Sequence, residues 1–329
     1  MNKHQTQFRA ILIILILILV LVFAYSGFRT VGTLVAPKAP VSTQSAGSKT
    51  ITRDGVEYFP RQDITVFMLM GIDRYGPVEA STSYNNEGAA DMVALAVFDE
   101  TNESYSVLML NRDTVMEMPV LGIGGRPAGT TVGQLALAHT YGTGLKDSCE
   151  NIKSAVSGFL YGIEIDHYFS MNMDAISMLN DAVGGVKVTV TDDFSAVDAT
   201  IPMGEVVLNG EQAFNFVQNR KGIGNQMNLS RMERQKSYIN GFLDALNTKL
   251  DASETFVVDT YNKIESYVVT NCSVTTLSSM LNRYSDYEFT GIQTPEGENV
   301  MTGEFMEYHV DEEKLDTLVL NLFYSEKKF

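Results

Sequence analysis

The chain has 329 residues, of which 45% are hydrophobic and 19% charged, a balance that excludes a disordered chain, a collagen and a small disulfide-rich protein. Lys and Arg total 24 against 40 Asp and Glu, so the net charge of -16 opposes binding of DNA or RNA by the general surface. Two cysteines are too few for a four-thiolate zinc site or a cysteine-ligated iron–sulfur cluster. We therefore expect one large or two small globular domains, and no nucleic-acid partner.

The first segment in chain order is an apolar stretch at residues 10–28, between Arg9 and Arg29. As a helix it would be roughly 28 Å long, close to the thickness of a bilayer's hydrocarbon core. A cleaved secretory signal is the alternative, but its apolar region is usually shorter, and the following YSGF makes a poor cleavage site. Lys3 and Arg9 lie on the leading side. The positive-inside tendency therefore predicts a cytoplasmic tail (residues 1–9), a single transmembrane signal anchor and a remainder outside the cell membrane.

Residues 29–60 have the composition of a linker. Pro37, Pro40 and the segment STQSAGS at residues 42–48 favour an extended, flexible chain. The pattern then becomes globular and continues to the last residue without another break in composition. We therefore expect a single extracytoplasmic domain over residues 61–329.

Strands and helices alternate through this domain. Short apolar runs predict strands at residues 64–70, 92–98, 105–110, 167–171, 186–190, 289–293 and 305–309. Longer periodic segments predict helices at residues 134–141, 148–161, 173–182, 210–219, 230–250 and 311–324. The alternation indicates an α/β fold whose sheet is covered by helices on both faces.

Local signals mark several helix ends. Asn209 is an N-cap residue for the helix that follows it. Ser230 and Glu233 match a capping box that opens the long helix. Gly184 ends the helix before it, because glycine adopts the left-handed conformation of a C-cap without strain.

Arginine and aspartate side chains gather next to the predicted strand ends and helix starts. They are Asp73 and Arg74 after the first strand, Asp91 before the second, Arg112 and Asp113 after the third, Arg220 at the end of the helix 210–219, and Arg231 and Arg234 at the start of the long helix. Active sites in α/β folds favour the carboxyl ends of strands. Arg231 and Arg234 share a helix face at an N-terminus, where free N–H groups and the helix dipole suit an anion.

This set of charges indicates phosphoryl chemistry. Guanidinium groups bind phosphate oxygens in bidentate fashion, and aspartates hold Mg²⁺, which bridges phosphates. Both stabilise charge that develops on a transferred phosphoryl group. The alternative for any single Arg–Asp neighbour is a surface ion pair worth about 0–1 kcal/mol. Recurrence of such residues at strand ends and helix starts favours a site.

Seven segments, taken together and in order, resemble a known family. They are VFMLMGIDR (66–74), AADMVALAVFD (89–99), VLMLNRDT (107–114), QLALAHTYG (134–142), GIEIDHYFSMNMDAISMLNDAVGGVKVTV (162–190), LNGEQAFNFVQNR (208–220) and SRMERQ (230–235). They cover about residues 62–250 behind the apolar N-terminal segment. The chain thereby resembles the LytR-CpsA-Psr family of membrane-anchored glycopolymer transferases, and its clostridial members most closely.

The resemblance implies an α-β-α sandwich with a central mixed sheet and a hydrophobic groove for a polyprenyl chain. It implies a phosphotransferase that moves a glycopolymer from a polyprenyl-pyrophosphate carrier to a cell-wall acceptor, usually peptidoglycan, through a phosphodiester. The implied cofactor is Mg²⁺.

The resemblance also implies roles for individual residues. Arg112, Arg220, Arg231 and Arg234 bind the pyrophosphate, with Arg74 as a further ligand by position; Asp91 and Asp73 hold Mg²⁺; Asp113 orients Arg112 or acts as the base; and Arg112, Asp113 and Asp91 are catalytic.

The chain departs from the family pattern at four positions. Ala89 and Gln218 each stand where many members have an arginine, Asn111 where proline is usual and Asn225 where aspartate is common. Losing two guanidinium groups would remove about a few kcal/mol of transition-state stabilisation if both face phosphate. Two alternatives therefore stay open: a non-catalytic polyprenyl-pyrophosphate-binding or regulatory module, and a polyprenyl-pyrophosphate phosphohydrolase that uses water as the acceptor.

Other residues have simpler interpretations. His139 lies in an apolar predicted helix and is interpreted as a packed histidine rather than a base. The segment GIGGRP (122–127) fails as a dinucleotide-binding loop, because proline replaces the third glycine. Cys149 and Cys272 either form a disulfide, which a location outside the membrane permits, or stay free. Apolar residues such as Met173 and Ile176 are interpreted as core, although some could line a lipid groove.

Overall fold

The structure is a computed structural model. It describes residues 50–326, apart from residues 84, 123–124, 220–222, 224–233, 235–236, 239, 243, 247, 250–251, 254, 285 and 304. The predicted cytoplasmic tail and transmembrane anchor at residues 10–28 lie outside the described residues. Within the described part of the chain, no helix is both long and apolar enough to cross a membrane.

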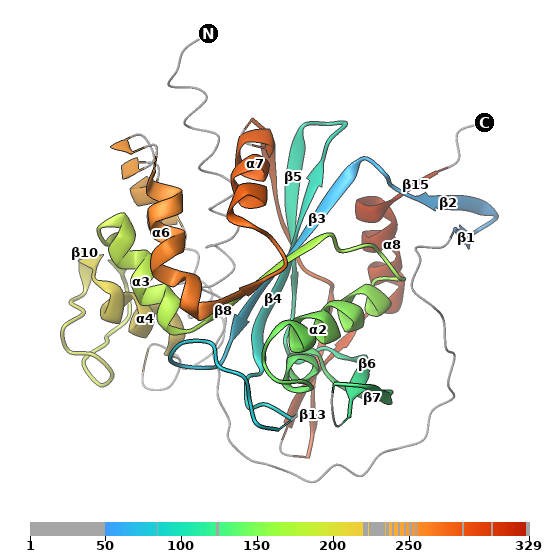
Figure 1. Ribbon diagram of the computed structural model, residues 1–329, viewed down its shortest axis with the longest axis horizontal. Helices are drawn as coiled ribbons and strands as arrows, with labels where there is room; N and C mark the ends of the chain where they lie inside the picture. The colour runs from blue at the N-terminus through green and yellow to red at the C-terminus, as the bar shows by residue number, and fades with distance from the viewer. Residues whose placement is uncertain are drawn as a thin grey trace.

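A six-stranded mixed sheet forms the centre of the molecule, in the order β11-β8-β3-β4-β5-β12 (Figure 1). Its strands are β3 (Ile64–Ile72), β4 (Ala90–Asp99), β5 (Ser104–Leu110), β8 (His167–Asn172), β11 (Val268–Thr270) and β12 (Glu288–Gln293). β4 is antiparallel to both β3 and β5, so β3 and β5 run in the same direction, and β8 is parallel to β3. The carboxyl ends of β3, β5 and β8 therefore lie at the same edge as the amino end of β4. We call this the Asp91 edge.

Helices cover both faces of this sheet (Figure 1). One face carries the 3₁₀ helix η2 (Leu135–Thr140), α2 (Lys146–Phe159) and α8 (Glu312–Phe323); the other carries α3 (Asp174–Val183), α4 (Gly210–Gln218), α6 (Phe256–Ile264), followed by the 3₁₀ helix η3 (Glu265–Tyr267), and α7 (Val274–Tyr284). Alternate residues of β3 point to opposite faces, so Met68 packs with α2 while Leu69 packs with α3. The predicted α/β fold with a central mixed sheet and helices on both faces is confirmed.

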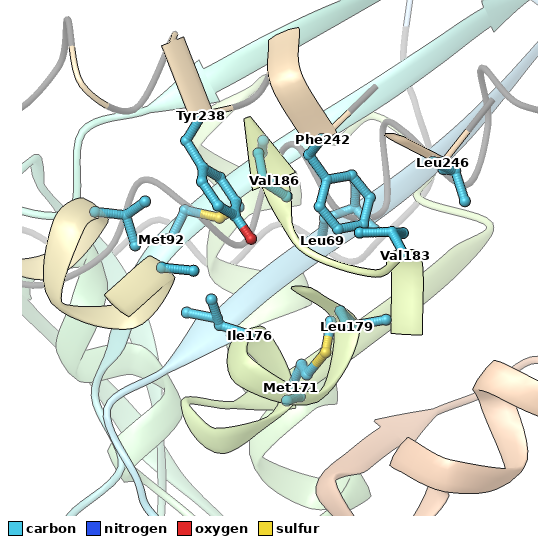
Figure 2. Close-up of a cluster of buried hydrophobic side chains, with 14 of the residues drawn as sticks. Leu69, Met92, Met171, Ile176, Leu179, Val183, Val186, Tyr238, Phe242 and Leu246 are labelled. Atoms are coloured by element: carbon cyan, nitrogen blue, oxygen red, sulfur yellow. The ribbon is translucent and has the colours of Figure 1, made fainter. Parts of the chain in front are cut away.

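The α3 side holds the larger of two hydrophobic clusters, which we call the α3 cluster (Figure 2). It joins sheet residues such as Met92 to Ile176 of α3. Tyr238, Phe242 and Leu246 are four residues apart and pack on the same cluster, as expected for one face of the predicted long helix. Each such buried side chain contributes about 1.5–3 kcal/mol to folding.

Four small sheets complete the fold in the described part of the chain. They are β1 (Ile51–Arg53) and β2 (Val56–Pro60) with β15 (Tyr324–Glu326); β6 (Val115–Leu121) with β7 (Pro127–Gln134); β9 (Val186–Val190) with β10 (Gly204–Leu208); and β13 (Gly297–Thr302) with β14 (Phe305–Val310). Two expectations change as a result. The predicted linker at residues 29–60 ends too late, because β1 and β2 belong to the folded domain. The strand predicted at residues 186–190 forms, but it pairs with β10 outside the central sheet.

The helix ends mostly follow the local signals. Asn209 caps α4 through a reciprocal capping box with Gln212. Gly184 follows α3 with a φ of 89°, in the left-handed region. The helix predicted at residues 134–141 is instead the short 3₁₀ helix η2. The proposed capping box of Ser230 and Glu233 lies outside the described residues.

Candidate active site

The turn that follows β5 carries Arg112 and Asp113 to the Asp91 edge. Arg112 Nη1 donates a hydrogen bond to Asp91 Oδ1, and Arg112 Nε lies 3.4 Å from Asp113 Oδ1. The Asp91 side chain is 1% exposed, whereas those of Arg112 and Asp113 are 22% and 26% exposed. A fully buried carboxylate thus faces a guanidinium group that remains accessible.

Hydrogen bonds from three directions fix this turn. Asn111 Oδ1 accepts from Asp113 N at 3.0 Å, which makes an Asx turn. The Arg112 carbonyl accepts from Ala136 N of η2, and the Asp113 carbonyl accepts from Tyr308 N of β14. Asn111 therefore restricts the turn through its side chain, where proline would restrict it through its ring.

Two buried polar atoms of the pair lack a hydrogen-bond partner among the described residues: Asp91 Oδ2 and Arg112 Nε. Leaving a buried polar group unsatisfied costs about 1–3 kcal/mol, and more when the group is charged. A cation would satisfy the Asp91 oxygen, which needs positive charge. A phosphate would satisfy the Arg112 N–H, which needs an acceptor.

The local charge balance is negative. Burial raises the pKa of Asp91 to about 6, Arg112 opposes this rise, and the nearby Asp73 and Asp113 carboxylates increase it. Mg²⁺ commonly takes only one or two carboxylates and completes its shell with phosphate and water oxygens. Asp91 with Asp73 fits such a site. Within the described ranges, no group of three or more His, Cys, Asp or Glu side chains is arranged to hold a metal by itself.

Asp73 and Arg74 follow β3 at the same edge, where backbone bonds hold both. Asp73 N donates to the Ala89 carbonyl at 2.9 Å, and the Arg74 carbonyl accepts from Met173 N at 2.9 Å. A Cβ on Gly88 would lie only 3.0 Å from Arg74 Cγ, so the stem of Arg74 runs alongside Gly88. The structure therefore brings Asp73 and Arg74 to the edge that carries Asp91 and Arg112.

Arg234 has contacts that the sequence did not predict. Its side chain is 3% exposed, Nε donates to the Phe216 carbonyl at 3.0 Å, and Nη1 pairs with Asp192 at 2.7 Å. Nη2 donates to the Asn219 carbonyl. Two of the guanidinium nitrogens thus donate to carbonyl groups at the C-terminal end of α4, where such groups need donors, and the third pairs with the Asp192 carboxylate. These contacts use three of the five guanidinium N–H groups and hold the carbonyl of Asn219, while the prediction that Arg234 binds pyrophosphate directly stays a prediction.

His139 is buried and structural. Its Nδ1 lies 2.7 Å from the Gly88 carbonyl, and Nε2 lies 3.9 Å from Cys149 Sγ. Because a carbonyl only accepts, Nδ1 carries the proton. Burial lowers the pKa of His139 to about 4, so the imidazole is neutral at neutral pH. The interpretation as a packed histidine is confirmed.

Comparison with known proteins identifies the family. The model of the LytR_cpsA_psr family matches residues 35–323, most of the chain. The chain belongs to the LytR_cpsA_psr family.

Curated relatives of this LytR_cpsA_psr protein carry transferase names. It is 27% identical over 277 residues to the polyisoprenyl-teichoic acid–peptidoglycan teichoic acid transferase TagV of Bacillus subtilis, covering 82% of this chain and 65% of TagV. It is 29% identical over 178 residues to the transferase TagU of Enterococcus faecalis, covering 54% of this chain and 52% of TagU. The chain thus spans about half to two thirds of the length of these two relatives.

Solved structures share the fold. Protein gbs0355 from Streptococcus agalactiae superposes with a TM-score of 0.63 at 20% identity, over 79% of this chain and 86% of that protein. B. subtilis TagV superposes with a TM-score of 0.57 at 22% identity, over 80% of this chain and 96% of that protein. A structure described as TagT bound to LIIa-WTA also has a TM-score of 0.57, at 19% identity over 79% of this chain and 90% of that protein.

One departure of this LytR_cpsA_psr protein has a visible structural consequence. Gln218, in place of the family's arginine, is 8% exposed, and its Nε2 donates to the hydroxyl of Tyr75 at 3.2 Å. Tyr75 comes two residues after Asp73, so Gln218 reaches the segment that leads away from the Asp91 edge. Sequence reasoning missed Tyr75, although its place directly after Asp73 and Arg74 was the available signal.

Three residues named in the sequence analysis and both cysteines remain. Arg220, Arg231 and Asn225 lie outside the described residues. Cys149 and Cys272 are both free and buried, and they belong to hydrophobic clusters on opposite faces of the sheet. The structure therefore contains the free cysteines, not the disulfide alternative.

Proposed function

We propose that this chain is a membrane-anchored phosphotransferase that moves a glycopolymer from a polyprenyl-pyrophosphate carrier to peptidoglycan as a phosphodiester. The family, the transferase names of its relatives and the description of TagT with LIIa-WTA support the reaction class and both partners. The observation that carries the proposal is the pairing of the buried Asp91 with the accessible Arg112, with an unsatisfied oxygen on one partner and an unsatisfied N–H on the other.

In the proposed reaction, Arg112 binds oxygens of the pyrophosphate. A hydroxyl oxygen of the acceptor forms a bond to the phosphorus that carries the glycopolymer, and the bond from that phosphorus to the bridging oxygen breaks. Polyprenyl phosphate leaves with the bridging oxygen. Asp113, which is accessible beside Arg112, takes the hydroxyl proton and releases it to water. Arg112 stabilises the charge that moves onto the leaving phosphate.

Asp91 and Asp73 would hold Mg²⁺. The unsatisfied Asp91 Oδ2 and the excess of carboxylates over guanidinium groups support this assignment. When bound, Mg²⁺ would neutralise phosphate oxygens and favour the charged form of the leaving group.

Further arginines would complete the pyrophosphate site. Arg220 and Arg231 are proposed as ligands from the family motifs. Arg74, whose stem runs beside Gly88 next to Ala89, would replace part of the charge that Ala89 lacks. Arg234 would fix the peptide that leads to Arg220.

The location follows from the substrate. A retained anchor at residues 10–28 would hold the domain at the outer surface of the cell membrane, within reach of a lipid-linked donor. The prenyl tail would lie in an apolar groove between the sheet and its helices, as the family resemblance implies.

Incorporation of a radiolabelled glycopolymer into peptidoglycan by the full chain with Mg²⁺ tests the proposal. We expect Arg112→Ala and Asp91→Asn each to reduce the rate about 100- to 1000-fold, as removal of a transition-state stabiliser does. Arg283→Gln is the matched control, because Arg283 is an exposed arginine that pairs with Glu100 on the surface. Unchanged rates in both site variants would overturn the proposal.

The same assay separates the two alternatives that Ala89 and Gln218 keep open. Release of phosphate without an acceptor would identify a phosphohydrolase. Tight binding of polyprenyl pyrophosphate without turnover on any acceptor would identify a binding or regulatory module.

A further inference from the structure

Tyr75 is an exposed aromatic side chain beside the Asp91 edge. It is 57% exposed, although it follows Asp73 by only two residues. Two residues of extended chain span at most about 7 Å, so Tyr75 lies close to the proposed pyrophosphate site. This exposure leaves much of the residue free to contact a ligand.

The backbone on either side of Tyr75 is held by the turn between β8 and α3. Met173 N donates to the Arg74 carbonyl at 2.9 Å. Gly76 N donates to Asp174 Oδ2 at 2.6 Å, and Asn172 Nδ2 donates to the Gly76 carbonyl at 2.9 Å. Gly76 adopts a φ of +77°, which a residue with a side chain rarely takes. The segment is therefore fixed, unlike a surface loop that is free to move.

The Tyr75 side chain is fixed as well, by two residues of α4. The Phe214 ring meets the Tyr75 ring edge to face, with centroids 6.0 Å apart and an interplanar angle of 69°. Gln218 binds the hydroxyl at 3.2 Å. Phe214 and Gln218 are four residues apart and so lie on the same face of α4. They hold the ring in one orientation, while Tyr75 as a whole residue stays 57% exposed.

A fixed, exposed ring suits a sugar. Its face carries negative partial charge, which attracts the C–H groups on the apolar face of a pyranose. Because the ring is already ordered, little conformational entropy is lost on binding. We propose that Tyr75 is a stacking platform for the first sugar of the donor, next to its pyrophosphate. The proposal rests on the proposed function. In it, Gln218 supports the ring instead of binding phosphate as the family's arginine would.

Binding to the full chain of two probes tests this inference. One is farnesyl pyrophosphate, and the other is the same lipid with one N-acetylglucosamine residue on its terminal phosphate. We expect Tyr75→Ala to weaken binding of the sugar-bearing probe about three- to tenfold and to leave binding of the bare probe unchanged. Tyr75→Phe keeps the ring and should retain most of the affinity.

Phe289→Ala is the matched control, because Phe289 is a 41% exposed aromatic residue at the other end of β5 from Arg112. It should change neither affinity. If Tyr75→Ala weakens both probes equally, or neither, the platform is wrong while the pyrophosphate site stands. If the unmodified chain binds neither probe, the proposed function fails and the platform fails with it.

Discussion

Asp91 and Arg112 are 21 positions apart in the chain, yet sequence reasoning placed them together. It did so because Asp91 precedes one predicted strand and Arg112 follows the next, and because the family resemblance assigns both residues to one site. The same reasoning did not foresee how deeply Asp91 is buried or that one of its oxygens lacks a partner, since both depend on how η2 and β14 pack around the turn. For Arg234, sequence indicated a ligand, but only packing against α4 shows which acceptors it binds.

The pH dependence of stability should report on His139. Its pKa is about 4 in the folded chain and 6.5 when unperturbed, so the unfolded state binds the proton first as the pH falls. The contribution of neutral His139 to the free energy of unfolding is complete above pH 6.5 and is lost as the pH falls towards 4. At pH 4.5 the loss is about 2–3 kcal/mol. Urea unfolding at pH 7 and pH 4.5 measures it.

His139→Asn keeps a donor for the Gly88 carbonyl and removes the titration. Between pH 7 and pH 4.5, the free energy of unfolding of this variant should therefore fall by about 2–3 kcal/mol less than that of the parent chain. An identical loss in the two proteins would show that His139 does not titrate as a buried group.

At the scale of elements, buried strands were the most predictable part. β3 and β4 are almost continuously buried, and their sequences are apolar runs. The two exposed hairpins were less predictable. In the β6–β7 hairpin, β7 reads PAGTTVGQ, without apolar alternation, and neither strand was expected. In the β13–β14 hairpin, only β14 was expected. Yet Tyr308 of β14 binds Asp113, so a weakly marked element supports the site.

Arg234 links α4 to the long helix, and its removal should destabilise the domain. Arg234→Gln leaves two carbonyls and Asp192 without their donor in a buried setting. We expect a loss of about 2–4 kcal/mol in the free energy of unfolding, measured by urea titration. Arg283→Gln, at an exposed ion pair, should lose less than about 1 kcal/mol. A stable Arg234→Gln variant with impaired pyrophosphate binding would instead favour a direct ligand role.

At the scale of the whole molecule, the two ends of the domain meet. β2 pairs with β15 through Tyr324 opposite Pro60, and Arg53 pairs with Asp316 of α8 at 2.7 Å. Sequence could not foresee this closure, because β1 and β2 are short and their contacts with α8 and β15 join residues more than 260 positions apart. The linker predicted from composition therefore extended to residue 60 and wrongly included β1 and β2.

A chain that begins at residue 61 should consequently be less stable than one that begins at residue 50. It loses the β2–β15 pairs and the packing of Ile51 and Tyr58 against the core of the α2 side. We expect a loss of about 2 kcal/mol, or about 5 °C in Tm by calorimetry. Equal melting temperatures would mean that β1 and β2 add nothing to the domain.

The central claim is that the Asp91 edge binds a pyrophosphate through Arg112. A crystal structure of the full chain with farnesyl pyrophosphate and Mg²⁺ tests it most directly. We predict phosphate oxygens within hydrogen-bond distance of Arg112 and a cation at Asp91 Oδ2. A pyrophosphate bound elsewhere, with the Asp91–Arg112 pair unchanged and unliganded, would contradict the claim.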